Sequence, residues 1–180
     1  MKQRISVQPL NLRGILGILD NIRAQDWIEI SNLVPRYMAE RHEFIAMHIM
    51  QMGGIGFVLS LDDRPVCMVH AVQRFEGSWS IGMIATDDFP RVFRFVIKEG
   101  VAIMAPVLRE AGARYMDAYV YADNSDARRL LARCGFRRAS RRLTNYGAFG
   151  KDFYLYTLSR EDAENVPWFK TSSTASERAD

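Results

Sequence analysis

Residues 115–136 read YMDAYVYADNSDARRLLARCGF, and this stretch says most about how the chain folds. Its first part, up to Ala122, consists mainly of aromatic and aliphatic residues, as expected for a strand. Asp123 and Asn124 are residue types that commonly cap a helix, and the segment after them is compatible with a short helix. Gly135 then provides a helix stop. The stretch therefore predicts a strand, a cap, a short helix and a turn.

A long amphipathic helix is expected just before this unit, at 88–111, with Asp87 or Asp88 as its N-cap and Pro90 in its first turn. Pro106, inside the same segment, is expected to kink or shorten that helix. Short polar turns separate three strand-like runs that come before the helix. They predict an antiparallel meander at 55–61, 65–75 and 78–86.

The remaining segments complete a mixed α/β order. In chain order they are expected to form a strand at 5–10, a helix at 11–21, a connector at 23–30, a helix at 36–52 and strands at 136–144 and 152–159. Asn11 can cap the first of these helices, and Gly53-Gly54 can stop the second. We expect one domain over residues 1–165 and a polar, disordered tail over residues 166–180.

Composition narrows the class of protein. A chain of 180 residues that is 48% hydrophobic and carries a net charge of +3 fits one globular domain with a sizeable core. No apolar stretch approaches the roughly 20 residues that span a bilayer, and no secretory signal is expected at the N-terminus. Cys67 and Cys134 form no C-x-x-C pair, which argues against a zinc site or a disulfide framework. These features predict a cytoplasmic protein without a membrane partner.

The central unit carries the pattern N-x-x-A-x-x-L-x-x-x-x-G-F. This pattern resembles the signature that ends the cofactor-binding half of the GNAT acyltransferase superfamily, whose enzymes use acetyl-coenzyme A (acetyl-CoA). The matching residues are Asn124, Ala127, Leu130, Gly135 and Phe136. The expected order of elements over residues 5–159 is also similar to the GNAT topology. The resemblance implies an α/β fold with a mixed central sheet of about six or seven strands and about four flanking helices.

The resemblance also implies where acetyl-CoA binds. In the superfamily, the strand that enters the long helix pairs its backbone with the pantetheine arm. A loop of the form Q/R-x-x-G-x-G/A then wraps the pyrophosphate with N–H groups at the helix N-terminus. An asparagine after the next strand often binds the pantetheine arm, and an arginine nearby can contact the 3′-phosphate. The cofactor-binding residues are thus expected at Ile84, Ala85, Thr86, Arg91, Val92, Phe93, Arg94, Asn124 and Arg128.

Two features depart from the superfamily pattern. The loop has no glycine, because Arg94 and Val96 occupy the two small positions. It can be an ordinary helix start, or Arg91 and Arg94 can supply charge in place of close backbone contact. Leu131 stands where a tyrosine commonly acts as general acid, and an aliphatic side chain cannot donate a proton. The sequence therefore assigns no catalytic residue.

Seven arginines crowd the region that follows Ala127. They can form a solvated surface, contact the 3′-phosphate of coenzyme A, or attract nucleic acid or an acidic protein. No aromatic-interleaved motif accompanies them, so nucleic acid is not a favoured partner. The three histidines lack ligand spacing, and no metal site is expected. The arginines are Arg128, Arg129, Arg133, Arg137, Arg138, Arg141 and Arg142.

Four short segments look like a GNAT-like family that is common in tailed bacteriophages and includes an internal virion protein of short-tailed phages. They are residues 22–29, 84–88, 124–136 and 146–153. This resemblance implies a phage or prophage origin, with the host cytoplasm or the virion as location. Two functions stay open. One is transfer of an acetyl group from acetyl-CoA to an unidentified primary amine. The other is a non-catalytic, virion-associated protein on a degenerate GNAT scaffold, with phage virion proteins as partners.

Overall fold

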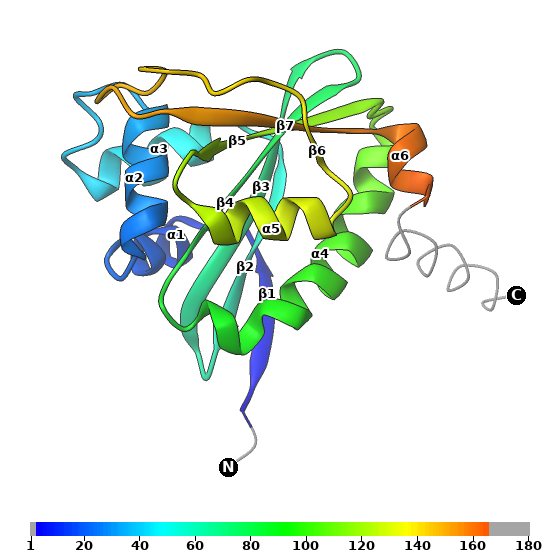
Figure 1. Cartoon of the computed structure of the whole chain (residues 1–180). Helices are drawn as coiled ribbons and strands as arrows, with labels where there is room; N and C mark the ends of the chain where they lie inside the picture. Colours follow the sequence, from blue (N-terminus) through cyan, green and yellow to red (C-terminus); the bar gives the residue numbers. More distant parts are fainter. Residues whose placement is uncertain (1–2, 166–180) are drawn as a thin grey trace, which may run out of the picture.

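A computed structural model describes residues 3–165 (Figure 1), so the expected tail at 166–180 lies outside the described residues. The strands are β1 (Ile5–Pro9), β2 (Ile55–Leu61), β3 (Arg64–Phe75), β4 (Ser78–Ala85), β5 (Tyr115–Tyr121), β6 (Arg137–Arg138) and β7 (Phe153–Ser159). The helices are α1 (Leu12–Leu19), α2 (Ala24–Leu33), α3 (His42–Gln51), α4 (Phe89–Glu110), α5 (Ser125–Arg133) and α6 (Arg160–Asn165).

The strands form one mixed sheet in the order β1-β2-β3-β4-β5-β7-β6. Every neighbouring pair is antiparallel except β4 and β5, which run parallel. The meander β2-β3-β4 confirms the prediction from the short polar turns. A mixed α/β fold with a sheet of seven strands is likewise as expected, although six helices are described instead of about four.

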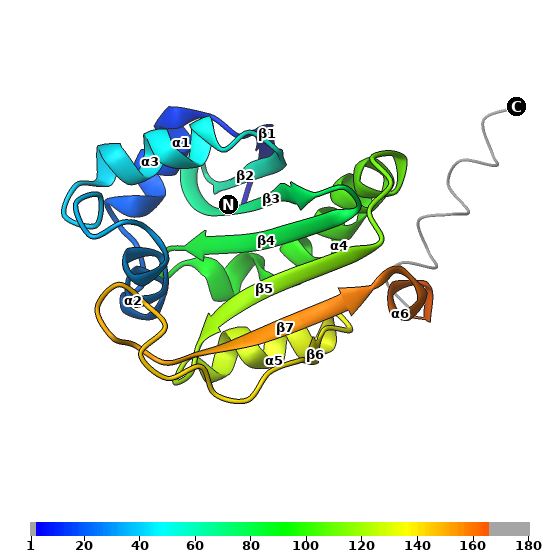
Figure 2. The same cartoon turned by 90° about the horizontal axis from the view of Figure 1, so that it is seen from above.

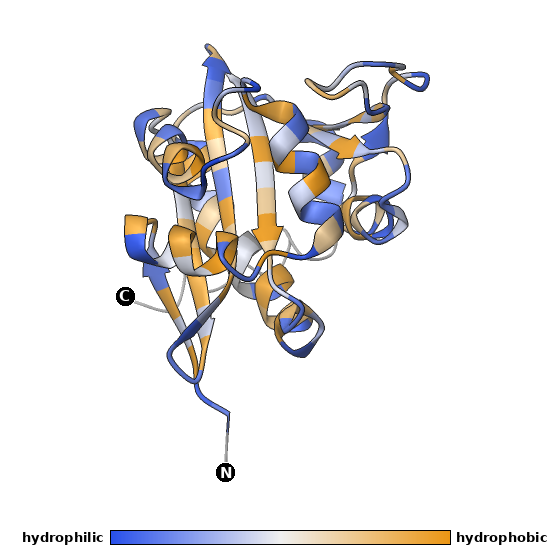
Figure 3. Cartoon of the chain, turned by 90° about the vertical axis from the view of Figure 1, so that its left-hand side faces the viewer, coloured by the Kyte–Doolittle hydropathy of each residue, from blue (hydrophilic) through white to orange (hydrophobic). Residues whose placement is uncertain are grey.

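Helices cover both faces of the sheet. On one face α1 and α3 pack against β2, β3 and β4 through a cluster that includes Ile15, Ile45 and Met68. On the other face α4 packs over the same strands, while α5 packs against β5 and β7. Figure 3 shows hydrophobic residues along the strands and hydrophilic residues in the loops. The buried apolar clusters therefore lie between the sheet and its helices on each side.

The two parallel strands separate soon after they begin. β4 pairs with β5 only at Ser78–Ser80, opposite Tyr115–Asp117. The Ser80 hydroxyl donates to the Asp117 carboxylate at 2.7 Å where this pairing ends. Beyond that point the strands diverge, and α2 lies across their ends (Figure 2). The sheet therefore contains a gap between β4 and β5.

Two predicted segments were wrong. The expected connector at 23–30 is mostly helix, because α2 spans Ala24–Leu33. Its buried side chains are polar, which hides the apolar periodicity by which such a helix is recognised. The expected strand at 136–144 pairs in a ladder only at Arg137–Arg138. After that the Ser140 hydroxyl, not a backbone carbonyl, accepts the N–H of Leu155, which interrupts the ladder.

Other boundaries differ less. α3 begins at His42, since residues 36–40 form turns instead of the first turns of a helix. Pro106 does not shorten α4, which continues to Glu110. α6 was not predicted from the sequence. Asn11 caps α1 as expected, and its side chain accepts the N–H of Gly14 at 2.8 Å.

Candidate active site

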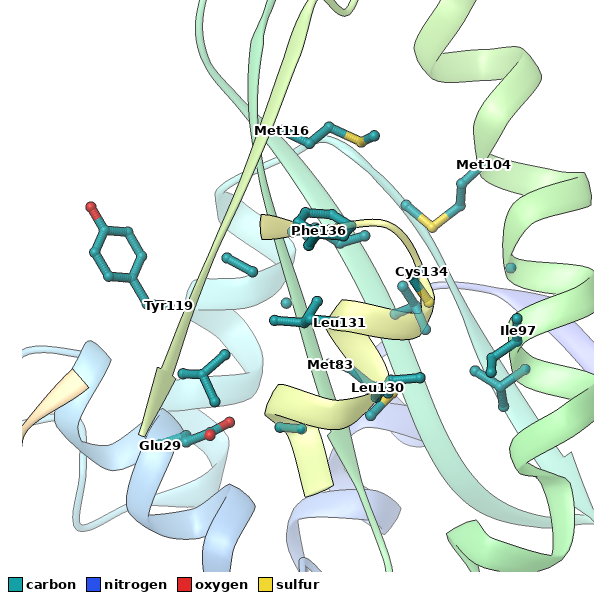
Figure 4. A pocket seen from close by; sticks show the side chains of 18 of the residues that line it. Glu29, Met83, Ile97, Met104, Met116, Tyr119, Leu130, Leu131, Cys134 and Phe136 are labelled. Atoms are coloured by element: carbon teal, nitrogen blue, oxygen red, sulfur yellow. The ribbon is translucent and has the colours of Figure 1, made fainter. Parts of the chain in front are cut away.

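A cavity of about 170 Å³ lies between α4 and α5, above the point where β4 and β5 diverge. We call it the slot. Its walls are mainly apolar, and Figure 4 shows Met83, Ile97, Met104 and Leu131 among the side chains that line it. Such a cavity can hold the apolar part of a ligand but offers few polar contacts.

A second cavity, of about 390 Å³, lies on the opposite face of the sheet, and we call it the cleft. Ile49 and Met68 belong to its lining, which places it on the side of the sheet that α1 and α3 cover. Its lining is more polar than that of the slot and includes His48, His70, Arg74, Ser80 and Tyr146.

The slot and the cleft meet at the gap between β4 and β5. Five residues line both cavities: Glu29, Ile81, Gly82, Met83 and Tyr119. A Cβ atom added to Gly82 would meet no heavy atom within 4 Å, so this position is open space. Two molecules that enter from opposite faces of the sheet can therefore approach each other here.

Carboxylates of α2 hold the two diverging strands. Asp26 accepts the N–H of Ala85 at 2.8 Å, at the end of β4, and is also paired with the Arg23 guanidinium at 2.7 Å. Glu29 accepts the N–H of Tyr121 at 3.0 Å, at the end of β5. The Glu29 oxygen that accepts this bond also accepts an amide N–H of Asn124 at 2.9 Å.

The two carboxyl groups have perturbed protonation. Burial, with a smaller contribution from the nearby charge of Asp26, raises the pKa of Glu29 from its ordinary value of 4.5 to about 8. The N–H groups of Tyr121 and Asn124 act against this shift. Burial also raises the pKa of Asp26, and it outweighs the ion pair with Arg23. Perturbed carboxyl groups beside a cavity are typical of functional sites.

Comparison with known proteins identifies the architecture. No family model and no curated protein matches the sequence. Solved structures do match the fold. One is a probable acetyltransferase (GNAT family) from Chromobacterium violaceum, with TM-score 0.64 and 16% identity over 88% of each chain. The chain has the GNAT acetyltransferase fold. This likeness shows the fold alone, since the identity is low.

Two further GNAT neighbours have more specific names. The ribosomal-protein-S18-alanine N-acetyltransferase from Escherichia coli matches with TM-score 0.61 and 17% identity, over 87% of this chain and 94% of its own. Mycobacterium smegmatis RimJ, solved in complex with CoA-disulfide, matches with TM-score 0.63 and 18% identity, over 97% of this chain and 90% of its own. None of these three neighbours is described as a phage protein, so they give no support to the phage-specific resemblance.

The three strand residues expected to pair with pantetheine direct their backbone groups to different neighbours. The backbone of Ala85 faces the gap, but its N–H is bonded to Asp26 and its carbonyl accepts the N–H of Arg23 at 3.0 Å. Thr86 donates its N–H to Val66 of β3 instead, and Ile84 pairs with Met68 of β3. None of the three residues lines the slot.

The expected pyrophosphate loop is helix in this GNAT fold. α4 begins at Phe89, so Arg91–Arg94 lie within its first turns and do not line the slot. The N–H of Phe89 is bonded to Thr86 and that of Arg91 to Asp88, while Pro90 has no N–H. The segment is thus an ordinary helix start, with Asp88 at the N-cap. Phosphate binding by its arginines stays a prediction.

The four loop residues make other contacts. Arg91 forms an ion pair with Asp88 at 2.7 Å, and Val92 is buried in the core under α4. Phe93 packs edge-on against Phe89, with ring centroids 5.8 Å apart. Arg94 is exposed. The structure therefore does not bring these residues together with the slot.

Asn124 lines neither the slot nor the cleft, and both of its amide atoms have partners. The oxygen caps α5 by accepting the N–H of Ala127 at 3.1 Å, and the nitrogen donates to Glu29. Arg128 lies elsewhere. Its guanidinium stacks over the Tyr154 ring at 5.7 Å, and it does not line the slot. Of the nine predicted residues, only Ile84 lines either cavity, namely the cleft, while Ala85 and Asn124 are hydrogen-bonded to carboxylates of α2.

Proton donors near the gap have high pKa values. Leu131 forms part of the slot wall, as Figure 4 shows, so the superfamily tyrosine has no counterpart there. The neighbouring Tyr146 hydroxyl, together with burial, raises the pKa of Tyr119 to about 12. The Tyr119 ring points away from the slot (Figure 4) and stacks on Tyr146 with centroids 5.1 Å apart. Burial raises the pKa of Cys134, in the slot wall, to about 11.

The sequence missed Glu29, Gly82 and Tyr119, which line both cavities. One signal was present: Asp26 and Glu29 lie three residues apart, a spacing that puts both on one helix face. Within residues 3–165 no cluster of His, Cys, Asp and Glu could hold a metal ion. No helix of the described chain is long and apolar enough to cross a membrane.

Proposed function

We propose that this chain is an N-acyltransferase that moves an acetyl group from acetyl-CoA to a primary amine. The pantetheine arm and thioester lie in the slot, and the amine enters through the cleft. The observation that carries the proposal is the meeting of the two cavities at the gap, where five residues line both. An acceptor nitrogen and a thioester carbon held there react as neighbours, which removes much of the entropic cost of their encounter.

The free edge of β4 suits a thioester donor. Ala85 turns its N–H and carbonyl toward the gap, and in an antiparallel strand alternate residues share this direction. Met83, two residues earlier, therefore presents its backbone to the gap, beyond the last pair between β4 and β5. An N–H in this position can pair with pantetheine or stabilise charge that develops on the thioester oxygen.

Ligand binding and turnover together test the proposal. Acetyl-CoA at 100 times its dissociation constant should stabilise the protein by about 2.7 kcal/mol, measurable as a raised melting temperature. With a peptide that carries one lysine and a blocked α-amine, acetyl transfer should release free coenzyme A thiol. A melting temperature unchanged by millimolar acetyl-CoA, together with no thiol release, would overturn the proposal.

A second candidate is a non-catalytic, virion-associated or partner-binding protein on the same fold. The observation in its favour is the N-terminus of α4, where the N–H groups of Phe89 and Arg91 are already bonded and Asp87 and Asp88 add negative charge. This function predicts no binding of acetyl-CoA. It also predicts that the chain is recovered with purified phage particles, and failure of that recovery counts against it.

A further inference from the structure

The Glu29 side chain is half-buried where the slot and the cleft meet. It projects from α2 toward the slot, as Figure 4 shows, and it lines the cleft as well. It is the only carboxyl group among the five residues shared by the two cavities. A carboxyl group in this position can contact both a donor in the slot and an acceptor in the cleft.

The hydrogen bonds of Glu29 leave one oxygen available. Oε1 accepts two hydrogen bonds, one from the N–H of Tyr121 and one from the Asn124 amide. Oε2 has no hydrogen-bond partner within residues 3–165. The side chain is therefore held in place by one oxygen while the other can accept a proton from a ligand.

We propose that Glu29 is the general base that removes a proton from the acceptor amine at the gap. This inference rests on the proposed acyl transfer and assigns its catalytic residue. The amine nitrogen forms a bond to the thioester carbon, and the carbon–sulfur bond breaks, so that sulfur leaves with the electron pair. Glu29 takes the proton that the nitrogen loses, and through solvent this proton ends on the thiolate. The products are the amide and free coenzyme A.

Other candidate bases are less suitable. Both oxygens of Asp26 are bonded to Arg23, and one of them also accepts the N–H of Ala85. His70 donates from Nε2 to the Gly53 carbonyl at 2.6 Å, and burial lowers its pKa. His48 and His70 line the cleft but not the slot. Glu29 alone among these groups combines the shared position with an available oxygen.

The surroundings of Glu29 determine when it is ionised. Burial and the like charge of Asp26 place its pKa at about 8, near the pH at which a general base works best. The Arg23 guanidinium lowers the pKa only weakly, since it is paired with Asp26. The other titratable groups that line the two cavities come from α3, β3, β5, α5 and the loop before β7, and are His48, His70, Arg74, Tyr119, Cys134 and Tyr146.

Glu29→Gln tests the role, because the Gln amide oxygen can still accept both N–H groups. Turnover is measured with acetyl-CoA and a peptide whose only amine is a lysine side chain. The wild-type rate should rise with pH through an apparent pKa near 8. The lysine ammonium itself titrates near about 10.4, so it adds a rise that continues to higher pH and cannot produce a change of slope near 8. In the variant the change of slope near pH 8 should vanish, and kcat should fall by about 100-fold or more.

The matched control is Glu43→Gln, which removes one carboxylate from an exposed position on α3. It should keep the wild-type rate and profile. Glu29→Gln should still show the melting-temperature shift with acetyl-CoA, which separates the loss of a base from the loss of donor binding. Unchanged turnover and profile in Glu29→Gln would overturn the role of Glu29 and leave the proposed function standing. Wild-type protein that binds acetyl-CoA but acetylates no amine would overturn both.

Discussion

The two regions expected to bind acetyl-CoA differ sharply. At the N-terminus of α4, where the diphosphate is expected, the N–H groups of Phe89 and Arg91 are bonded within the chain, and Asp87 and Asp88 add negative charge. At the gap, β4 has a free edge and two cavities meet. Under the proposed function, the region that would hold the thioester is therefore more open to a ligand than the region that would hold the nucleotide.

This contrast has an energetic meaning. A helix N-terminus attracts phosphate because unpaired N–H groups and the positive end of the helix dipole face it. Asp88 at the N-cap already interacts favourably with that dipole, and it also neutralises Arg91 through their ion pair at 2.7 Å. Donor affinity in this chain should therefore come mainly from the apolar slot and the strand edge, and little from phosphate.

The largest expected effect comes from closing the gap. Gly82→Leu places a side chain on the cleft side of β4, in space where an added Cβ meets nothing within 4 Å. Acyl transfer should fall by about 100-fold, because the amine can no longer reach the thioester. Unfolding in urea should show unchanged stability. The control Ala132→Leu places a leucine at an exposed site on α5 that does not line the slot. Full activity of Gly82→Leu would contradict the role of the gap.

The second effect concerns stability and pH. Between pH 4.5 and about 8 the folded protein keeps Glu29 protonated while the unfolded chain does not. The contribution of Glu29 to the free energy of unfolding is complete below pH 4.5 and is lost as the pH rises to about 8. The loss amounts to about 1.4 kcal/mol for each unit by which the pKa values of the folded and unfolded states differ. In Glu29→Gln this part of the pH dependence should be absent from urea unfolding. If the free energy of unfolding changed with pH equally in the two proteins, the pKa of Glu29 would lie near its ordinary value.

The sequence predicted the sheet better than the site. Alternation and short turns between 55 and 86 predicted the meander, and Asn124 to Phe136 predicted α5 and its cap. The gap was harder to predict because α2 builds it from buried polar side chains, which follow no apolar period. The sequence also could not show which residues of β4 direct their backbone groups to the gap. The backbone of Ala85 and Met83 faces the gap and that of Thr86 faces β3, a distinction that only strand pairing determines.

A smaller effect concerns how much the nucleotide and the thioester arm each contribute to the binding of acetyl-CoA. S-acetylpantetheine lacks the nucleotide and the diphosphate. It should nevertheless protect against thermal unfolding nearly as well as acetyl-CoA, because few groups at the start of α4 are available to bind the phosphates. Melting curves at matched concentrations of the two thioesters measure this. A dissociation constant about 100-fold weaker for S-acetylpantetheine, equivalent to about 2.7 kcal/mol, would show that the α4 region does bind phosphate.

The smallest expected effect comes from a single charge. Asp87 is exposed beside the start of α4, so Asp87→Asn should improve acetyl-CoA affinity by a few-fold, about 0.3–1 kcal/mol, at low salt. The same change should leave the affinity for S-acetylpantetheine unaltered. Asp63→Asn, in the exposed turn between β2 and β3, is the control for charge alone. Equal gains for both thioesters would mean that Asp87 acts on something other than phosphate.

The contrast between the two regions can be measured directly by following backbone amide signals in an NMR titration with acetyl-CoA. The account predicts the largest shifts at Ile81, Gly82 and Met83, which border the gap. Phe89 and Arg91, at the start of α4, should change little because their N–H groups already have partners. Large shifts at Phe89 and Arg91 with none at the gap, or no shifts at either region, would contradict it.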